Sequence, residues 1–293
     1  MTWKENLISL YLHISESKAI ENYLLGLRMS NNYKPEFTDQ EIMTIYLFGI
    51  HQNQTKVKHI YAYTRQHLLD WFPKLPSYEA FSNRLNKLSG AFELLTQEAI
   101  NKGRNQLTFT LESVIDSMPI IVAGNSRSSS AKTAKEICAK GYCSSKGMYY
   151  HGLKLHLLGF VRPYTLPMPE YCWFTSAEAN DLNAAKDVLE HVFNRKIYAD
   201  KIYYAEHHAQ ELMQNNNTMI LAPIKKAKGQ KLQDAADNLF SAAVSGVRQP
   251  IESFFNWLNE KTQIQNATKV RSAAGLMTHV WGKLAAALLL LIF

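Results

Sequence analysis

The spacing of apolar residues changes once along this 293-residue chain, and that change constrains the fold more than any other feature. Up to about Asn105, apolar residues recur every three or four positions, for example over residues 81–88, which is the period of a helix with one buried face. Over residues 107–112, apolar and polar residues alternate, which is the period of a half-buried strand. The change predicts two domains, an all-helical one over residues 1–105 and an α/β one over residues 106–293.

The second part of the chain alternates strand-like and helix-like segments. Its first strand is predicted to end at Asp116, and a helix is expected over residues 181–193, where apolar side chains form one stripe. Four further strands are expected at residues 149–158, 171–175, 196–199 and 218–222. Three strands that can form a meander, followed by alternating helices and strands, favour a mixed central sheet flanked by helices.

Two helices in the first domain have recognisable starts. Thr38 is followed three residues later by Glu41, and Ser77 follows Pro76; both patterns satisfy amide groups in a first helical turn. Basic side chains on these helices suit a DNA-binding domain, although a solvated helix face carries the same charges. Both interpretations of the helical domain stay open at this point.

The chain is basic overall. It has 32 Lys and Arg against 25 Asp and Glu, which gives a net charge of +7 and a pI near 9.1. A polyanion such as DNA is a natural partner for this charge, although many basic proteins bind no nucleic acid.

The cysteines and the apolar C-terminal segment bear on the compartment. Cys138, Cys143 and Cys172 form no CxxC pair, which argues against a disulfide framework or a thiolate zinc site and indicates a reducing cytoplasm. The first residues lack the layout of a secretory signal. The apolar segment 284–293 is shorter than the ~18 residues needed to cross a bilayer, so we expect a buried helix and no membrane partner.

Three carboxylates from distant parts of the second domain are candidate metal ligands. Asp116 and Asp200 each follow a predicted strand, and Glu252 lies early in a helix expected to open near Pro250. Mg²⁺ and Mn²⁺ prefer carboxylate oxygens, and a pair of such cations can clamp the attacking and leaving oxygens of phosphoryl transfer. Asp181 is the alternative second carboxylate; its other role is a helix N-terminal charge.

Five short blocks follow one another through the second domain. They are Ile115-Asp116-Ser117-Met118-Pro119, Tyr142-Cys143-Ser144-Ser145-Lys146, Tyr149-Tyr150-His151-Gly152-Leu153-Lys154-Leu155-His156, Ala199-Asp200-Lys201-Ile202-Tyr203 and Arg248-Gln249-Pro250-Ile251-Glu252-Ser253-Phe254-Phe255. Together they resemble the blocks of bacterial insertion-sequence transposases of the DDE type, over about residues 107–285. The chain departs from the usual pattern at Ile202 (for glycine), Ser245 (for tyrosine) and Asn259 (for lysine).

The resemblance implies a ribonuclease-H-like α/β fold in which Asp116, Asp200 and Glu252 hold divalent cations, Mg²⁺ or alternatively Mn²⁺. It implies an enzyme that cleaves insertion-sequence ends and transfers the freed 3′ hydroxyls to target DNA, acting as a homodimer when two ends are held together. Two alternatives are a nuclease of the same fold that does not join DNA ends, and a degenerate or domesticated copy that binds DNA without catalysis.

Five further residues are secondary candidates for DNA contact. Arg248 stands four residues before the third carboxylate, where it can brace that carboxylate or meet a phosphate. Lys154 and His156 point the same way from one predicted strand, with a core histidine as the alternative for His156. Arg127 and Lys146 bound a basic, serine-rich segment that suits phosphate contacts or forms a solvated loop.

Overall fold

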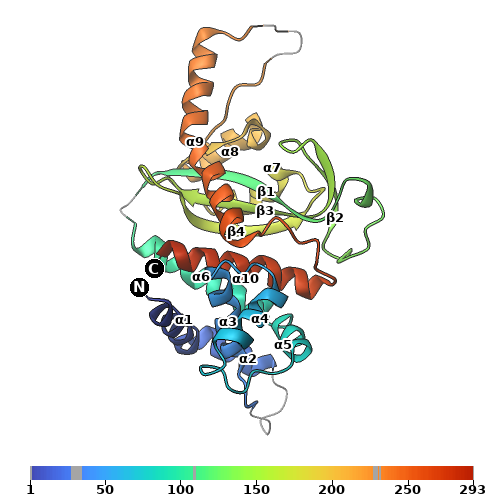
Figure 1. Ribbon diagram of the computed structural model, residues 1–293. Coiled ribbons are helices and arrows are strands. Elements are labelled where there is room, and N and C mark those ends of the chain that lie inside the picture. The colour runs from blue at the N-terminus through green and yellow to red at the C-terminus, as the bar shows by residue number, and fades with distance from the viewer. Residues whose placement is uncertain (1, 28–34, 108–109, 227–229, 231, 293) are drawn as a thin grey trace. The chain divides into compact units, whose positions relative to one another are not determined.

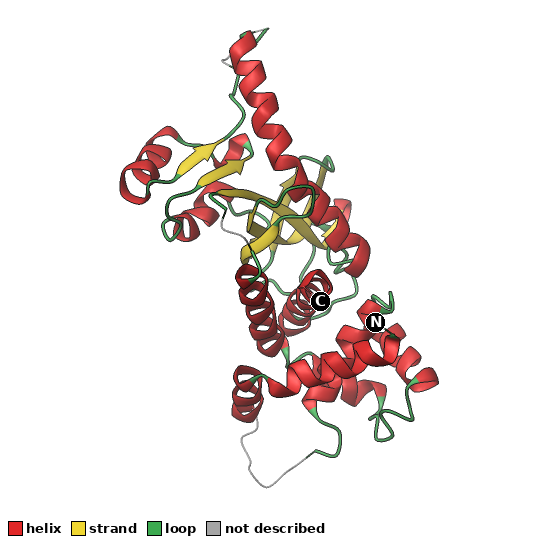
Figure 2. Ribbon diagram, turned by 90° about the vertical axis from the view of Figure 1, so that its left-hand side faces the viewer, coloured by secondary structure: helices red, strands yellow, loops and turns green. Residues whose placement is uncertain are grey.

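The chain divides into two compact units in the computed structural model, which describes residues 2–27, 35–107, 110–226, 230 and 232–292. One unit contains Met1–Lys102 and Leu258–Phe293, and the other contains Gly103–Trp257. In the described part of the chain, the segment before the first strand is wholly helical (Figure 2). The predicted change from helical to mixed structure near residue 105 is therefore present.

The first unit is built around a helix that is apolar on all sides. This helix is α3 (Asp39–His51), and its residues from Ile42 to Ile50 are all buried. It packs against α1, α4, α5 and α10. The helices of this unit are α1 (Trp3–Glu16), α2 (Lys18–Leu27), α3, α4 (Val57–His67), α5 (Tyr78–Leu85), α6 (Ser89–Asn105) and α10 (Ala273–Ile292) (Figure 1).

Both helix starts expected from the sequence are present. Thr38 caps α3 in a capping box, in which its hydroxyl accepts from the Glu41 amide (3.2 Å) and the Glu41 carboxylate accepts from the Thr38 amide (2.6 Å). Ser77 caps α5 by accepting from the Ala80 amide at 3.3 Å. These contacts explain where the two helices begin.

Thr38→Ala is expected to lower the free energy of unfolding by about 1 kcal/mol, because alanine leaves an amide of the first turn without its acceptor. Urea denaturation followed by circular dichroism measures the change. Thr38→Ser keeps the accepting hydroxyl and serves as the control, with an unfolding free energy within about 0.5 kcal/mol of the wild type. Equal stability of the alanine variant and the wild type would contradict the role given to this cap.

The last part of the chain belongs to the helical unit, which differs from the prediction of one domain over residues 106–293. Residues from Leu258 onward group with the N-terminal helices, and α10 packs against α3. The approach is close: a Cβ atom added to Gly282 of α10 would lie 2.6 Å from the ring of Tyr46 of α3. Because α3 and α10 are both apolar around most of their surface, each needs apolar partners on several sides.

Helix α10 is also the one described helix that is long and apolar enough to cross a membrane. The expected apolar segment 284–293 was too short for this, but the helix that forms spans Ala273–Ile292. Length therefore does not decide the question. In this structure 67% of the 18-residue apolar stretch of α10 is buried, as in the core helix of a globular protein. The length and composition of α10 alone are therefore weak evidence that it spans a membrane.

The second unit is a six-stranded mixed sheet with helices on both faces. Its centre is β1 (Glu112–Gly124), which runs antiparallel to β3 (Met148–Phe160) and parallel to β5 (Lys196–Ala199). Beyond β5 lies the parallel strand β6 (Met219–Leu221). The other edge of β3 pairs first with β2 (Ala139–Cys143) and then with β4 (Met168–Ser176). This is the mixed sheet flanked by helices that the sequence predicted, and it agrees with the ribonuclease-H-like fold that the resemblance implied.

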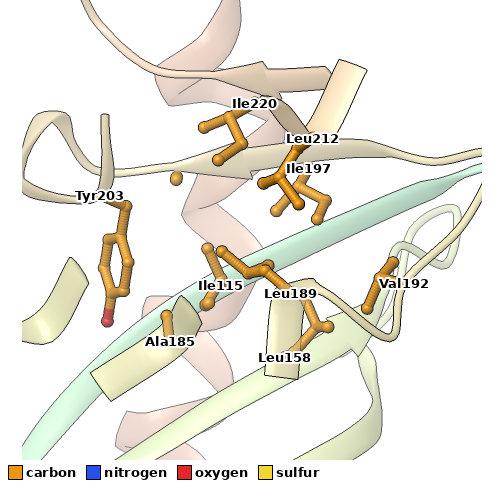
Figure 3. Packing of buried hydrophobic residues seen from close by; sticks show 10 residues of the cluster. Ile115, Leu158, Ala185, Leu189, Val192, Ile197, Tyr203, Leu212 and Ile220 are labelled. Carbon is orange, nitrogen blue, oxygen red and sulfur yellow. The ribbon is translucent and has the colours of Figure 1, made fainter. Parts of the chain in front are cut away.

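The helices α7 (Asp181–Leu189) and α8 (Glu206–Asn216) pack on one face of the sheet. They bury a core of Ile115, Leu158, Ala185, Leu189, Val192, Ile197, Ala199, Tyr203, Leu212 and Ile220 (Figure 3). The opposite face is crossed by α9 (Ala235–Thr262) (Figure 1). Because successive strand residues point to opposite faces, Ile115 enters this core and Asp116 points toward the α9 side.

Strand β1 differs from the prediction that it ends at Asp116. It begins at Glu112 and continues through Pro119 to Gly124, whereas residues 108–109 of the expected alternation lie outside the described residues. The pairing of β1 with β5 ends at Ile115, so the rest of β1 has an unpaired side on which a proline is tolerated.

Three other expectations need correction. The segment 127–146, for which a solvated loop was one of the two interpretations, contains strand β2. The helix expected over residues 181–193 ends at Leu189. The helix expected to open near Pro250 begins at Ala235 and continues through the proline. In the last case the helix tolerates the loss of one amide donor, although a proline usually marks a helix start or break.

Candidate active site

Asp116 and Asp200 lie side by side where two parallel strands part. Their preceding residues, Ile115 and Ala199, are the last paired residues of β1 and β5. Asp116 accepts a hydrogen bond from the Ser117 amide (2.8 Å), and Asp200 accepts one from the amide of the residue after it (2.7 Å). The charge of Asp200 is close enough to raise the pKa of Asp116. The strand ends therefore bring these two carboxylates together.

Arg248 joins Asp116 to Glu252 through two short ion pairs. Its Nη1 lies 2.7 Å from Oδ2 of Asp116, and its Nη2 lies 2.7 Å from Oε1 of Glu252. Arg248 and Glu252 share one face of α9 because this helix continues through Pro250. The guanidinium group therefore braces both carboxylates, one of the two roles that the sequence left open for it.

The electrostatics of this cluster are set mainly by the burial of Asp116. Burial raises the pKa of Asp116 to about 6; Arg248 and the Ser117 amide lower it, and Asp200 and Glu252 raise it further. The positive charge of one arginine therefore does not fully compensate the three carboxylates. Additional positive charge near Asp116 would favour its ionised form.

The ligand chemistry of the cluster fits a hard divalent cation, although the described residues contain no compact group of three His, Cys, Asp or Glu side chains that would enclose one. Between Asp116 and Glu252 the positive charge is supplied by the guanidinium of Arg248. Asp116, Asp200 and Glu252 offer oxygen ligands alone, which suit Mg²⁺ or Mn²⁺ better than a softer metal.

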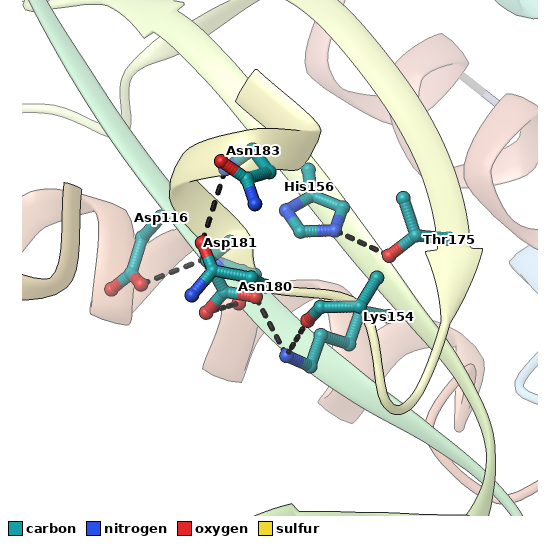
Figure 4. Close-up of polar contacts among 9 residues, drawn as sticks. Asp116, Lys154, His156, Thr175, Asn180, Asp181 and Asn183 are labelled. Atoms are coloured by element: carbon teal, nitrogen blue, oxygen red, sulfur yellow. Dashed lines mark hydrogen bonds and ion pairs between the residues drawn. The ribbon is translucent and has the colours of Figure 1, made fainter. Parts of the chain in front are cut away.

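Asp181, the alternative second carboxylate, is held in a separate network at the start of α7. Its Oδ1 accepts from the Lys154 ammonium at 2.7 Å, and its Oδ2 accepts from the Ser117 hydroxyl at 3.2 Å (Figure 4). The charges that shift the pKa of Asp116 come instead from Arg248, Asp200 and Glu252. This geometry favours Asp200 over Asp181 as the partner of Asp116.

Lys154 and His156 point to the same face of β3, as the sequence predicted, and the structure shows that this face is covered by α7. The Lys154 ammonium also donates to the carbonyl of Ala179 at 2.7 Å, so it is committed to the start of α7. His156 is fully buried and lies 2.7 Å from the Thr175 hydroxyl (Figure 4). Its ring stacks on that of Trp173, with the ring centroids 5.2 Å apart. Burial lowers the pKa of His156 to about 4. His156 is thus the core histidine of the two alternatives, because a buried ring cannot reach DNA.

Arg127 and Lys146 are exposed. Arg127 closes the short helix η1 (Asn125–Arg127), and Lys146 lies in the turn between β2 and β3. Their positions are compatible with phosphate contacts.

The network of Asp181, Lys154 and Ser117 was not predicted from the sequence. Lys154 and Asp181 are separated by 27 positions, and Ser117 and Asp181 by 64. Only the register of β1 and β3 and the packing of α7 bring these groups together. The adjacent Asn180 gave a usable signal, since it caps α7 by accepting from the Asn183 amide at 3.1 Å.

A mixed sheet with acidic residues where its central parallel strands part defines the ribonuclease-H-like class. The family model described as "Transposase DDE domain" matches residues 107–273, more than half of the chain. The chain belongs to this family of DDE transposases, which implies that it binds DNA. Comparison with curated proteins and with solved structures found no match.

Proposed function

We propose that this protein is a catalytically active transposase that cleaves the ends of an insertion sequence and joins the freed 3′ hydroxyls to target DNA. The observation that carries the proposal is that Arg248 joins Asp116 to Glu252 through two ion pairs, and that the charge of Asp200 lies close enough to Asp116 to raise its pKa. A structural ion pair would need one acid for one base. Two carboxylates paired with one arginine, with the charge of Asp200 near Asp116, instead leave an excess of negative charge, which costs stability and is typical of a functional site.

Asp116, Asp200 and Glu252 would hold the divalent cation, Mg²⁺ or Mn²⁺. Such cations, when bound, activate the attacking water or 3′ hydroxyl and neutralise charge on the leaving oxygen. The role of the protein is to fix the oxygen ligands: the Ser117 amide orients the Asp116 carboxylate, and the backbone after Asp200 orients the second. Arg248 lies where its guanidinium could release these carboxylates and bind a phosphate of the DNA instead.

We assign recognition of the terminal repeats to the helical domain predicted over residues 1–105, with catalysis in residues 106–257. The segment from Leu258 onward then supports the helical domain, because it packs within that unit. Transposition requires two element ends to be held together, so we infer a homodimer in the complex with DNA. The proposed activity places the protein in the compartment that holds the DNA, which in a bacterium is the cytoplasm.

The test is a cleavage assay with the full-length protein. The substrate is a labelled plasmid that carries the coding sequence with its natural flanks, incubated with Mg²⁺ or with a chelator, and every cut is mapped to the nucleotide. Mg²⁺-dependent cuts at two defined ends, followed by joining to a second plasmid, are the expected result. Cuts without joining would indicate a nuclease of the same fold, and binding without cuts would indicate an inactive DNA-binding protein.

A further inference from the structure

Two tyrosines lie exposed and directly opposite each other on β2 and β3. Tyr142 and Tyr149 are a cross-strand pair, their ring centroids are 5.0 Å apart, and 54% and 55% of their surfaces are exposed. The other face of the same hairpin buries Cys143 and Tyr150. A two-stranded element with one buried face normally carries polar residues on its outer face. These aromatic rings therefore serve a purpose other than closing the core.

A positive charge lies beside the two rings, in a basic segment of the chain. The Lys140 ammonium lies 4.8 Å from the centroid of the Tyr149 ring and donates to the Ser129 hydroxyl at 2.9 Å. Residues 125–149 contain five Lys and Arg and one acidic residue. We call Lys140, Tyr142 and Tyr149 the hairpin patch. Exposed aromatic rings beside cations are the combination that binds single-stranded nucleic acid.

The hairpin patch lies on the same face of the sheet as Asp116. In the β1–β3 register Asp116 is opposite Leu157, so the two side chains share a face. Tyr149 precedes Leu157 by eight positions on β3, an even number, which places it on that face too. Eight residues of strand cover ~27 Å, which is about the length of eight stacked nucleotides.

We propose that the hairpin patch binds the DNA strand flanking the cleavage site, with unpaired bases stacked on Tyr142 and Tyr149 and a phosphate held by Lys140. The placement of the scissile phosphate near Asp116 rests on the proposed function. The aromatic rings favour unpaired bases over intact duplex, because a ring can stack only on a base face that is not already covered. Duplex binding through phosphates alone would call for cations without the tyrosines.

The test measures binding of a fluorescein-labelled oligothymidine of about 20 nucleotides to full-length protein by anisotropy, in the presence of a chelator so that no cleavage occurs. The double variant Tyr142→Leu/Tyr149→Leu keeps apolar bulk but removes both rings. We expect it to bind the oligonucleotide at least about fivefold more weakly. The matched control is Phe193→Leu, an aromatic residue that is also 55% exposed but lies outside the hairpin, with unchanged binding.

A second variant separates stacking from hairpin stability. Tyr142→Phe/Tyr149→Phe retains both rings, so binding within about twofold of the wild type is expected. Loss of binding in the phenylalanine variant, or full binding in a folded leucine variant, would overturn the proposal. If the leucine variant bound the oligonucleotide fully but no longer formed a dimer in sedimentation, the patch would be assigned to contact with a second copy of the chain instead.

These outcomes are independent of catalysis. Tyrosine-dependent binding without any end cleavage would leave the hairpin patch standing and overturn only the proposed function. End cleavage without tyrosine-dependent binding would support the proposed function and overturn only the role of the hairpin patch.

Discussion

Asp116→Asn, Asp200→Asn and Glu252→Gln are each expected to slow Mg²⁺-dependent cleavage of DNA ends by at least about a thousandfold, or ~4 kcal/mol of transition-state stabilisation. Each amide is close in size to the carboxylate it replaces but carries no charge, so it binds a hard cation poorly. Initial cleavage rates at saturating DNA measure the effect. Binding of the uncut ends in the presence of a chelator should stay close to that of the wild type.

Asp181→Asn is the matched control for Asp200→Asn. Asp181 lies 2.7 Å from the Lys154 ammonium at the start of α7, so Asp181→Asn should lower the unfolding temperature and leave the cleavage rate of the folded protein close to that of the wild type. Thermal unfolding of both variants separates the two effects. A wild-type cleavage rate for Asp200→Asn together with an inactive, folded Asp181→Asn would move the second carboxylate to Asp181.

Arg248→Gln is expected to raise, by about one pH unit, the pH below which the affinity for the divalent metal falls. The pKa of Asp116 is raised to about 6 by burial, and the guanidinium of Arg248 opposes that rise. Without the arginine the pKa rises further, so the carboxyl group remains protonated at a pH where the wild type is ionised. At a pH near 6.5 the variant should therefore bind Mn²⁺ about threefold more weakly, because roughly three quarters of Asp116 is ionised in the wild type and roughly one quarter in the variant.

Titration calorimetry with Mn²⁺ from about pH 5.5 to about pH 8.5 tests this shift. At the alkaline end Asp116 is ionised in both proteins, and the variant should bind at least as tightly, because no guanidinium competes for the Asp116 oxygen. Arg248→Lys retains a positive charge and should lie between the two, whereas Arg271→Gln, at an exposed position, should not shift the profile. Superimposable profiles for Arg248→Gln and the wild type would refute the coupling.

The carboxylate cluster shows which parts of a site can be predicted from local sequence patterns. The strand over Lys196–Ala199 was predicted with its correct bounds, and with it the position of Asp200 directly after β5. Asp116 was predicted to close its strand and instead lies within β1. Both predictions nevertheless placed the two acids at one level of the sheet, because the parallel pairing of β1 and β5 ends at the residues just before them.

Other features depended on contacts that a local pattern does not contain. The hairpin strand β2 is short and rich in polar and small residues, so its pairing with β3 rather than its own composition makes it a strand. The helical continuation of α9 through Pro250 likewise carried no local signal. That continuation places Arg248 and Glu252 on one helical face.

By itself, the sequence determined the helical and mixed halves of this protein, most of its strands, two helix caps and the blocks that place it among DDE transposases. These features follow from the periodicity of apolar residues and from short-range chemistry, which act within one or two turns or strands. The tertiary structure alone decided that residues from Leu258 onward join the helical unit and that Arg248 pairs with Asp116. Both depend on packing between segments more than a hundred residues apart, and the spacing within either segment does not encode it.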